Sequence, residues 1–337
     1  MLRNLAAFLL ILCAGPNLRA LVDVRWPVRE QRPYLEALPP AHWAQPTISG
    51  RVESALFGCV RNGGHRFHEA IDIAPAEPRR RGEATDPVIA ALPGRVLGIN
   101  PHAGNSSYGR YVVLVHEDQD VPVYTLYSHL ARIAEGLDEG DWVELGETVG
   151  IMGRSASYAI PRSRAHLHFE IGLMKSARFD DWYHEQPYGS KNRFGNANGI
   201  NLIGMDPLPF FAAARKGLPS LSAYFDSLPT AFSLRISTNR VPDFVERYPA
   251  LLTRPIPDDG ELVAWLVDYT WYGLPFRWTP LTAAEVPPAR TGDVSLMFAD
   301  ESAFAGRCRE TIEFGRDGSA SLGDNLRNDL AMIFGFY

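Results

Sequence analysis

The sequence lacks an excess of basic charge, a second long apolar run and any internal repeat. Its formal net charge is -6 and no Lys/Arg cluster stands out, so it offers no basic face to nucleic acid. Beyond the N-terminus, no stretch is apolar over the about 20 residues that a membrane span needs. The 337 residues are 46% hydrophobic and 21% charged, which is typical of globular proteins, and the length suggests about two domains.

The N-terminus is predicted to be a secretory signal peptide, residues 1–20. A basic start precedes an apolar run, Leu5–Gly15, that is too short to cross a bilayer, and cleavage is expected near Ala20. A lipoprotein anchored at Cys13 and an uncleaved membrane anchor are the alternatives, but the bulky Leu12 does not fit a lipoprotein signal. We therefore expect a secreted or periplasmic, envelope-associated protein with no membrane span after cleavage.

Two cysteines, Cys59 and Cys308, remain after the signal. In an oxidising compartment they could form a disulfide that ties the C-terminal region to the first domain. They could also be two unrelated small buried residues. The second interpretation is slightly preferred, because the sequence alone contains no distance between them.

The region after the signal begins with a Pro-rich segment, residues 21–48, which is expected to be an extended lead-in on the surface. Residues 49–216 are expected to form the first domain. Up to about residue 174, short β-rich runs alternate with turn residues, and a 3.6-residue periodicity is almost absent. We predict a mainly β domain with an antiparallel sheet or sandwich core. The expected strands are 87–94, 95–99, 111–116, 123–129 and 166–173, with a hairpin over 143–152.

The rest of the chain is less regular. Residues 175–200 are rich in Gly, Asn and aromatic side chains, and a loop this long is usually functional or disordered. A short helical segment is expected at 211–216. Residues 217–337 are predicted to form a smaller α+β domain of unknown role, with helices at 241–252 and 326–333 and strands at 262–272, 291–298 and 311–314. The aromatic stretch 265–278 is interpreted as core, the alternative being a glycan-stacking platform.

Five polar residues could form a hydrolytic metal site: HxxxD at His68 and Asp72, HxH at His166 and His168, and His129 between them. Successive side chains of a strand alternate faces, so His166 and His168 point the same way. Zinc accepts imidazole nitrogen and carboxylate oxygen, and three protein ligands leave a fourth position for water. A free imidazole nearby could take the proton of that water or hydrogen-bond the developing oxyanion.

These spacings alone leave a structural interpretation open. Each of the nine histidines is more often a surface or core residue than a ligand, and bare HxH or HxxxD is a weak signal. His65 competes with His68 but lacks the spacing to Asp72, so we interpret it as a loop residue. His116 is expected to be structural and His102 solvated.

Two further groups have open interpretations. Asp180, Asp181 and His184 could form a second metal site, although such a cluster is more often a polar loop. Glu170 shares a face with the HxH motif if the strand continues, so it could support a ligand or be a surface carboxylate.

The flanking residues decide between these interpretations. Arg66-Phe-His-Glu-Ala-Ile-Asp72 and Ala165-His-Leu-His168 resemble the metal motifs of the lysostaphin-like, or LytM-type, zinc metalloendopeptidases. That family cuts peptidoglycan cross-bridge peptides and has the duplicated hybrid motif fold. The resemblance covers about residues 49–212, with further collinear segments at 86–96, 108–116, 124–130, 143–153 and 206–210.

The resemblance implies one Zn²⁺ per chain, held by His68, Asp72 and His168. His129 and His166 match the family's two catalytic histidines. Three departures put the substrate preference in doubt. Ala70 stands where the family usually has Gly; Ala165 replaces the usual Pro, next to a loop, 154–164, without the common Thr-Gly pattern; and residues 175–200 are an insertion. Because that insertion follows the strand with His168, we expect it to be a lid or wall of the cleft.

We therefore expect a zinc endopeptidase acting on peptidoglycan peptides, with no expectation about its oligomeric state. One alternative is a catalytically silent cell-wall binding or activator module, which would bind no stoichiometric zinc. Another is a secreted metalloprotease with a non-wall protein substrate.

Overall fold

The computed structural model describes residues 21–77, 82–258, 260–287, 289–309, 311–315 and 317–335. The expected signal peptide, residues 1–20, lies outside the described residues. Within the described part of the chain, no helix has the length and apolarity needed to cross a membrane.

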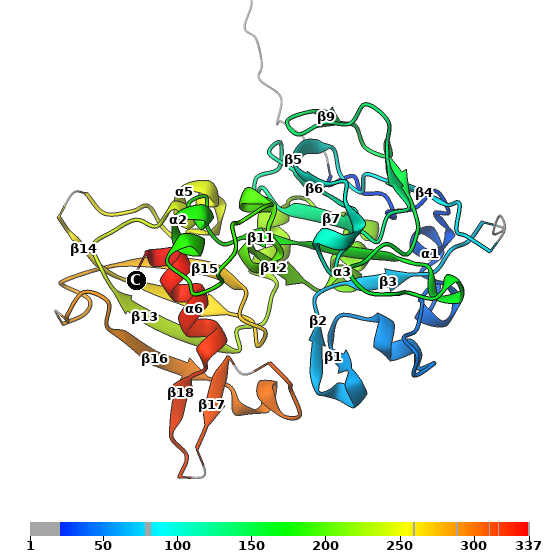
Figure 1. The fold of residues 1–337 in the computed structure, drawn as a ribbon. Helices are drawn as coiled ribbons and strands as arrows, with labels where there is room; N and C mark the ends of the chain where they lie inside the picture. Colours follow the sequence, from blue (N-terminus) through cyan, green and yellow to red (C-terminus); the bar gives the residue numbers. More distant parts are fainter. Residues whose placement is uncertain are drawn as a thin grey trace, which may run out of the picture.

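A large antiparallel sheet forms the centre of the first half (Figure 1). Its strand order is β12-β11-β7-β6-β5-β9, and β3 pairs with β11 beside this path. The sheet confirms the expected mainly antiparallel β architecture. The strands are β3 (Ile71–Ile73), β5 (Gly94–Asn100), β6 (Tyr111–Val115), β7 (Tyr124–Ser128), β9 (Trp142–Val143), β11 (Leu167–Met174) and β12 (Leu202–Met205).

Smaller sheets flank this one. Strands β4 (Pro87–Ile89), β10 (Thr148–Ile151) and β8 (Arg132–Ile133) form one, and β1 (Gly58–Arg61) pairs with β2 (Arg66–His68) to form another. The hairpin expected over 143–152 is wrong. A turn does close between Glu144 and Glu147, but β9 pairs with β5 while β10 pairs with β4 and β8. The two strands separate because each edge finds its backbone partners in a different sheet.

Successive side chains of β11 alternate between an apolar face and a polar face. Leu167, Phe169 and Ile171 belong to the main hydrophobic core. His168 and Glu170 point to the opposite face, which is nevertheless also buried. A buried polar face needs internal partners for its charges and hydrogen bonds.

The Pro-rich lead-in is not confined to the surface, which corrects the expectation for residues 21–48. Trp26 and Trp43 are 2% and 5% exposed and meet edge to face with ring centroids 5.1 Å apart. The backbone of Val28 bridges to Val88, and that of Ala44 bridges to Ile73. An extended chain can still add hydrogen bonds to sheet edges and bury its aromatic rings, which composition alone does not reveal.

The C-terminal region is built on an antiparallel sheet with the order β15-β14-β13-β16 (Figure 1). Trp265 and Trp278 are buried in its core, as expected. Pro249 follows α5, so the helix expected over 241–252 is instead α5 and a separate 3-10 turn. The elements are α4 (Leu221–Asp226), β13 (Phe232–Ser237), α5 (Asp243–Arg247), β14 (Leu262–Tyr269), β15 (Pro275–Thr282), β16 (Val294–Ala299), β17 (Ile312–Phe314), β18 (Ala320–Leu322) and α6 (Asp324–Phe334).

This region packs against the hairpin of β1 and β2. The ring centroids of Phe57 and Tyr272 lie 5.0 Å apart, and those of Phe67 and Trp271 lie 5.7 Å apart. Cys59 and Cys308 form a disulfide with their Cα atoms 5.5 Å apart, so the preference for unrelated cysteines is wrong. Packing between segments 249 residues apart brings the thiols together, and no local pattern encodes it.

His116 is a buried structural histidine, as expected. It is fully buried and donates Nδ1–H to the carbonyl oxygen of Pro93, 2.7 Å away, while its Nε2 lies 2.9 Å from the Thr125 hydroxyl. Burial lowers the pKa of His116 from 6.5 to about 4, more than its Pro93 hydrogen bond raises it.

We predict an acid-sensitive contribution of His116 to stability. Between pH 6.5 and 4, His116 is protonated in the unfolded chain but not in the folded protein. Its contribution to stability is therefore complete above about pH 6.5 and decreases as the pH is lowered. From pH 8 to pH 5 the wild type should lose about 2 kcal/mol more unfolding free energy than His116→Asn. Urea unfolding of both proteins at both pH values measures this, and equal losses would contradict it.

Candidate metal centre

Strand register brings three candidate ligands together. In the pairing of β11 with β3, His168 lies opposite Asp72, and on the other side of β11 it lies opposite Ser128 of β7. His68 ends β2, three residues before β3 begins. The first and second motifs, ninety-odd residues apart in the sequence, therefore meet on one face.

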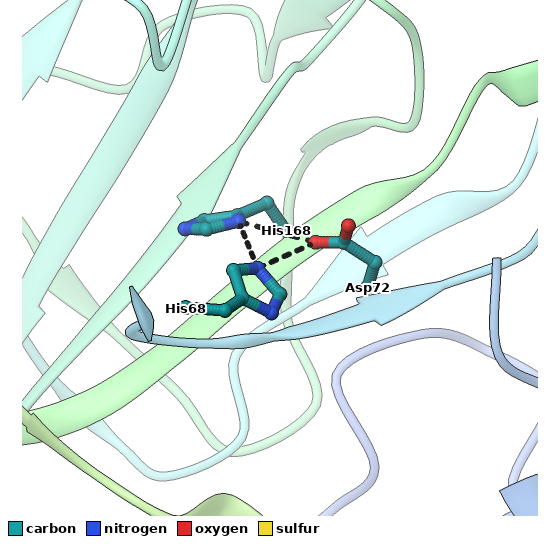
Figure 2. A group of neighbouring side chains, drawn as sticks. All are labelled: His68, Asp72 and His168. Atoms are coloured by element: carbon teal, nitrogen blue, oxygen red, sulfur yellow. Dashed lines mark hydrogen bonds and ion pairs between the residues drawn. The ribbon is translucent and has the colours of Figure 1, made fainter. Parts of the chain in front are cut away.

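The ligand atoms of His68, Asp72 and His168 form a compact triangle (Figure 2). His68 Nε2 lies 3.2 Å from His168 Nδ1, and Asp72 Oδ1 lies 3.2 Å from the first nitrogen and 3.1 Å from the second. All three side chains are buried. Ligand atoms of a tetrahedral zinc ion with bonds of about 2.0–2.1 Å lie about 3.3 Å apart, so this set fits zinc.

The outer nitrogen of each imidazole is committed elsewhere. His68 Nδ1 donates to the carbonyl oxygen of Leu56, 2.7 Å away. His168 Nε2 donates to Glu170 Oε1, 3.0 Å away. These bonds orient both rings and direct His68 Nε2 and His168 Nδ1 toward Asp72, an arrangement that metal-binding histidines commonly need.

Glu170 is 1% exposed, so the surface-carboxylate interpretation is wrong. Besides His168, it accepts hydrogen bonds from the hydroxyls of Tyr108 and Tyr124 at 2.7 and 2.9 Å. Burial and the neighbouring Glu170 hold the pKa of both tyrosines well above 10, which keeps them as donors. The two tyrosines were not expected in the site, because their contact with Glu170 depends on strands far apart in the sequence.

The neighbouring charges shift the pKa values of His168 and Asp72. Burial lowers the pKa of His168, but the hydrogen bonds that it donates to the carboxylates of Asp72 and Glu170 outweigh burial and raise its pKa to about 9. Burial raises the pKa of Asp72, whereas His166 and His68 together hold it well below its usual value. A metal ion bound at Nδ1 of His168 would therefore replace a proton there.

His129 and His166 lie beside the triangle with ring centroids 4.6 Å apart. Each donates Nδ1–H to a carbonyl oxygen 2.8 Å away, that of Ser155 and that of Arg164 respectively. Burial lowers the pKa of both rings, and the neighbouring His166 and His168 lower that of His129 further. Both rings are thereby favoured in the neutral form, with Nε2 able to accept a proton.

The backbone at His129 is held in an uncommon conformation, with φ at 61°. The neighbouring segment supports it: Ser155 N–H donates to the His129 carbonyl, and His129 N–H donates to the Tyr108 carbonyl. Gly109 permits this approach, because a Cβ there would lie 2.0 Å from the Ser155 carbonyl oxygen. Such conformations occur at functional sites where surrounding structure enforces them.

Arg61 is a further residue at this centre that was not expected from the sequence. Its Nη2 lies 2.6 Å from His68 Nε2 and 2.5 Å from Asp72 Oδ2. Arg61 is outside both motifs, and no spacing signals its contact with them.

Two departures from the family pattern fit the local backbone. Ala70 has no positive φ, so glycine is not required there. Ala165 has φ -57° and ψ 136°, values that proline also adopts.

The remaining candidates lie elsewhere. His65 and His102 are exposed, as expected for loop residues. Asp180, Asp181 and His184 are also exposed, and among the described residues the metal-compatible group is His68, Asp72 and His168. The alternative of a second metal site at 180–184 therefore gains no support.

The centre opens into a cleft of about 890 Å³. One wall comes from the 175–200 insertion, which contains a short helix, α2 (Phe179–His184), and lines the cleft with Trp182, Tyr188 and Phe194. Helix α6 adds Asn325, Asn328 and Asp329 to the lining. Figure 1 shows α2 beside α6, and buried Phe179 and Trp182 pack in one cluster with Met332. The C-terminal region is thus part of the cleft.

Comparison with known proteins supports the resemblance. Residues 66–180 match the model of peptidase family M23. No curated protein matches the chain. Among solved structures, Helicobacter pylori Csd3 is similar at 22% identity and a TM-score of 0.28, over 45% of this chain and 30% of that chain.

Two further structures are similar. A zinc-containing peptidase from Vibrio cholerae shares 25% identity over 45% of this chain and 36% of that one, with a TM-score of 0.28. The catalytic domain of lysostaphin from Staphylococcus simulans shares 21% identity over 47% of this chain and 87% of that one, with a TM-score of 0.29. This chain thus spans about a third of the Csd3 and Vibrio chains. TM-scores this low carry no argument, so the comparison that counts is the family model: residues 66–180 match peptidase family M23.

Proposed function

We propose that this protein is a zinc-dependent endopeptidase that hydrolyses peptide bonds of bacterial peptidoglycan. In this proposal His68, Asp72 and His168 hold one zinc ion, while His129 and His166 handle protons. The observation that carries it is the triangle of ligand atoms with mutual distances of 3.1–3.2 Å, beside two neutral histidines. The match of residues 66–180 to a peptidase family supports the same reaction class.

Zinc bound to these ligands would polarise the scissile carbonyl and bring the pKa of a bound water toward 7. The protein's own residues provide the rest. His129 and His166 can each accept the water's proton at Nε2, and a ring that has become charged can hydrogen-bond the developing oxyanion. Their Nδ1 bonds to the Ser155 and Arg164 carbonyls keep that nitrogen directed into the cleft.

We propose that the cleft binds an extended peptide. The metal centre lies within it, and the insertion 175–200 and helix α6 form further walls along it. Lys175 of the insertion pairs with Asp329 of α6 at 2.6 Å, with both side chains largely buried, so the two walls are joined. We propose that these walls select the peptide, because they are where this chain departs from its family.

The family resemblance and the N-terminal pattern support the proposal of a wall substrate. Lysostaphin, one of the similar structures, is described as an antimicrobial peptidase. A secretory signal at residues 1–20 would deliver the enzyme to the envelope. We therefore propose a secreted or periplasmic location, with peptidoglycan peptides as the partner.

The decisive experiment is digestion of purified peptidoglycan, with the fragments identified by mass spectrometry. We expect new amino and carboxyl termini within the stem or bridge peptides. His168→Ala should lose both stoichiometric zinc and wall lysis, because it removes one of the three proposed ligands. A variant that clears wall suspensions at the wild-type rate would sink the assignment. Cleavage of secreted proteins but not of peptidoglycan would instead favour a protease with another substrate.

His129→Gln and His166→Gln separate proton transfer from metal binding. Each should keep one zinc per chain and lose about 10²- to 10⁴-fold in hydrolysis rate, because the proton acceptor is gone. His102→Gln, at an exposed loop position, is the matched control and should behave as the wild type. Zinc content by elemental analysis and fragment release are measured together. Full activity in both site variants would remove these residues from the mechanism.

Glu170→Gln tests the support of His168. The amide retains the size of the side chain but not the charge that orients and polarises the imidazole, so zinc affinity should fall about 10- to 100-fold. Tyr124→Phe removes one hydrogen bond to Glu170 and leaves its carboxylate on His168, so it should change affinity much less. Zinc titration against a chromophoric chelator gives both values, and equal affinity of Glu170→Gln and wild type would refute this role.

A further inference from the structure

Arg61 makes contacts that neither the motif nor the proposed chemistry uses. It ends β1, and its Nη2 reaches both His68 Nε2, at 2.6 Å, and Asp72 Oδ2, at 2.5 Å. Its side chain is 19% exposed and that of Asp72 is 3% exposed, so this ion pair is largely removed from water. A guanidinium in such a place compensates a buried carboxylate that would otherwise be costly.

The contact with His68 uses the electron pair that a metal would need. His68 donates its Nδ1 proton to the Leu56 carbonyl, so Nε2 is the acceptor nitrogen of the neutral ring. That nitrogen has one lone pair in the ring plane, and Arg61 donates an N–H to it. A metal ion at Nε2 and the Arg61 hydrogen bond therefore exclude each other.

We propose that Arg61 competes with the metal: its guanidinium group occupies the metal centre until zinc displaces it. This inference rests on the metal site of the proposed function. On loading, the guanidinium leaves His68 Nε2, because two positive charges cannot share the same lone pair and would repel at this distance. Arg61 thereby lowers the affinity for zinc while stabilising the metal-free protein.

Zinc can displace Arg61 by moving its side chain alone, because the backbone around Arg61 is held in place. Strand β1 pairs with β2 through Gly58 opposite His68 and Cys59 opposite Phe67. Cys59 is also joined to Cys308, which holds the strand to the C-terminal region. The register shifts between Cys59 and Arg61, and such irregularities redirect side chains next to sites. The adjoining cleft of about 890 Å³, which Arg61 also lines, leaves room for the guanidinium to turn away.

The test compares zinc affinity in the full chain with its disulfide intact. Protein stripped with a chelator is titrated with zinc against a chromophoric competitor, for the wild type, Arg61→Leu and Arg66→Leu. Both variants remove one positive charge from the same hairpin, but Arg66 is exposed and makes no hydrogen bond to the centre. Arg61→Leu should bind zinc at least about tenfold more tightly, because hydrogen bonds to charged groups are worth roughly one such factor or more. Arg66→Leu should change affinity only slightly.

Thermal unfolding provides a second measurement. Metal-free Arg61→Leu should melt below the metal-free wild type, since Asp72 loses its compensating cation, and it should gain more from zinc than the wild type gains. Arg61→Gln, which also lacks the charge and retains a polar group, repeats the titration if the leucine variant does not fold. Equal or weaker zinc binding in the Arg61 variants would overturn the inference and indicate that Arg61 supports Asp72 instead.

These outcomes are separable from those of the proposed function, because zinc binding is measured separately from peptidoglycan hydrolysis. If His168→Ala abolishes zinc binding and the Arg61 variants leave it unchanged, only the proposal that Arg61 competes with zinc is refuted. An absence of zinc binding in every variant would refute the competitor and the metal site together. Tight binding in Arg61→Leu combined with intact peptidoglycan would support the competitor and refute the substrate.

Discussion

The register of strand β11 is the constraint on which the site depends. Its two neighbours set it: Asp72 of β3 lies opposite His168 on one side, and Ser128 of β7 lies opposite it on the other, immediately before His129. A slip of one residue would turn His168 into the hydrophobic core and Phe169 out of it. Because Leu167, Phe169 and Ile171 are buried in that core, their burial fixes the register and thereby places the ligand atoms.

A second constraint comes from burial of the polar face itself. Four imidazoles and two carboxylates that are largely removed from water would be unstable if they were unpaired. Each ring therefore gives its outer nitrogen to a fixed acceptor: the carbonyls of Leu56, Ser155 and Arg164 for three rings, and Glu170 for His168. The inner nitrogens face the centre as a consequence. The same bonds that make the cluster tolerable in the fold also prepare it to bind a cation and to accept protons.

The parts that the sequence predicted are those with short-range causes. Alternation along a strand places His166 and His168 together, and alternating β-rich runs predict the antiparallel sheet. The grouping of His68 with Asp72 needed the family resemblance, because their spacing alone is a weak signal. The rest depends on packing between distant segments: the burial of Trp26 in the core, the bond between Cys59 and Cys308, and the reach of Arg61 into the centre. No local pattern records those contacts.

The C-terminal region supports the candidate metal centre through two sets of contacts. Through the disulfide and the contact of Phe67 with Trp271, it holds the hairpin that carries both His68 and Arg61. Through α6 it packs against the 175–200 insertion, and the Lys175–Asp329 pair joins these walls of the cleft. A single region thus supports the proposed ligand His68, the neighbouring Arg61 and a wall of the cleft. Changes in its packing would therefore alter the proposed metal centre and the walls of the cleft together, even though none of the proposed ligands belongs to it.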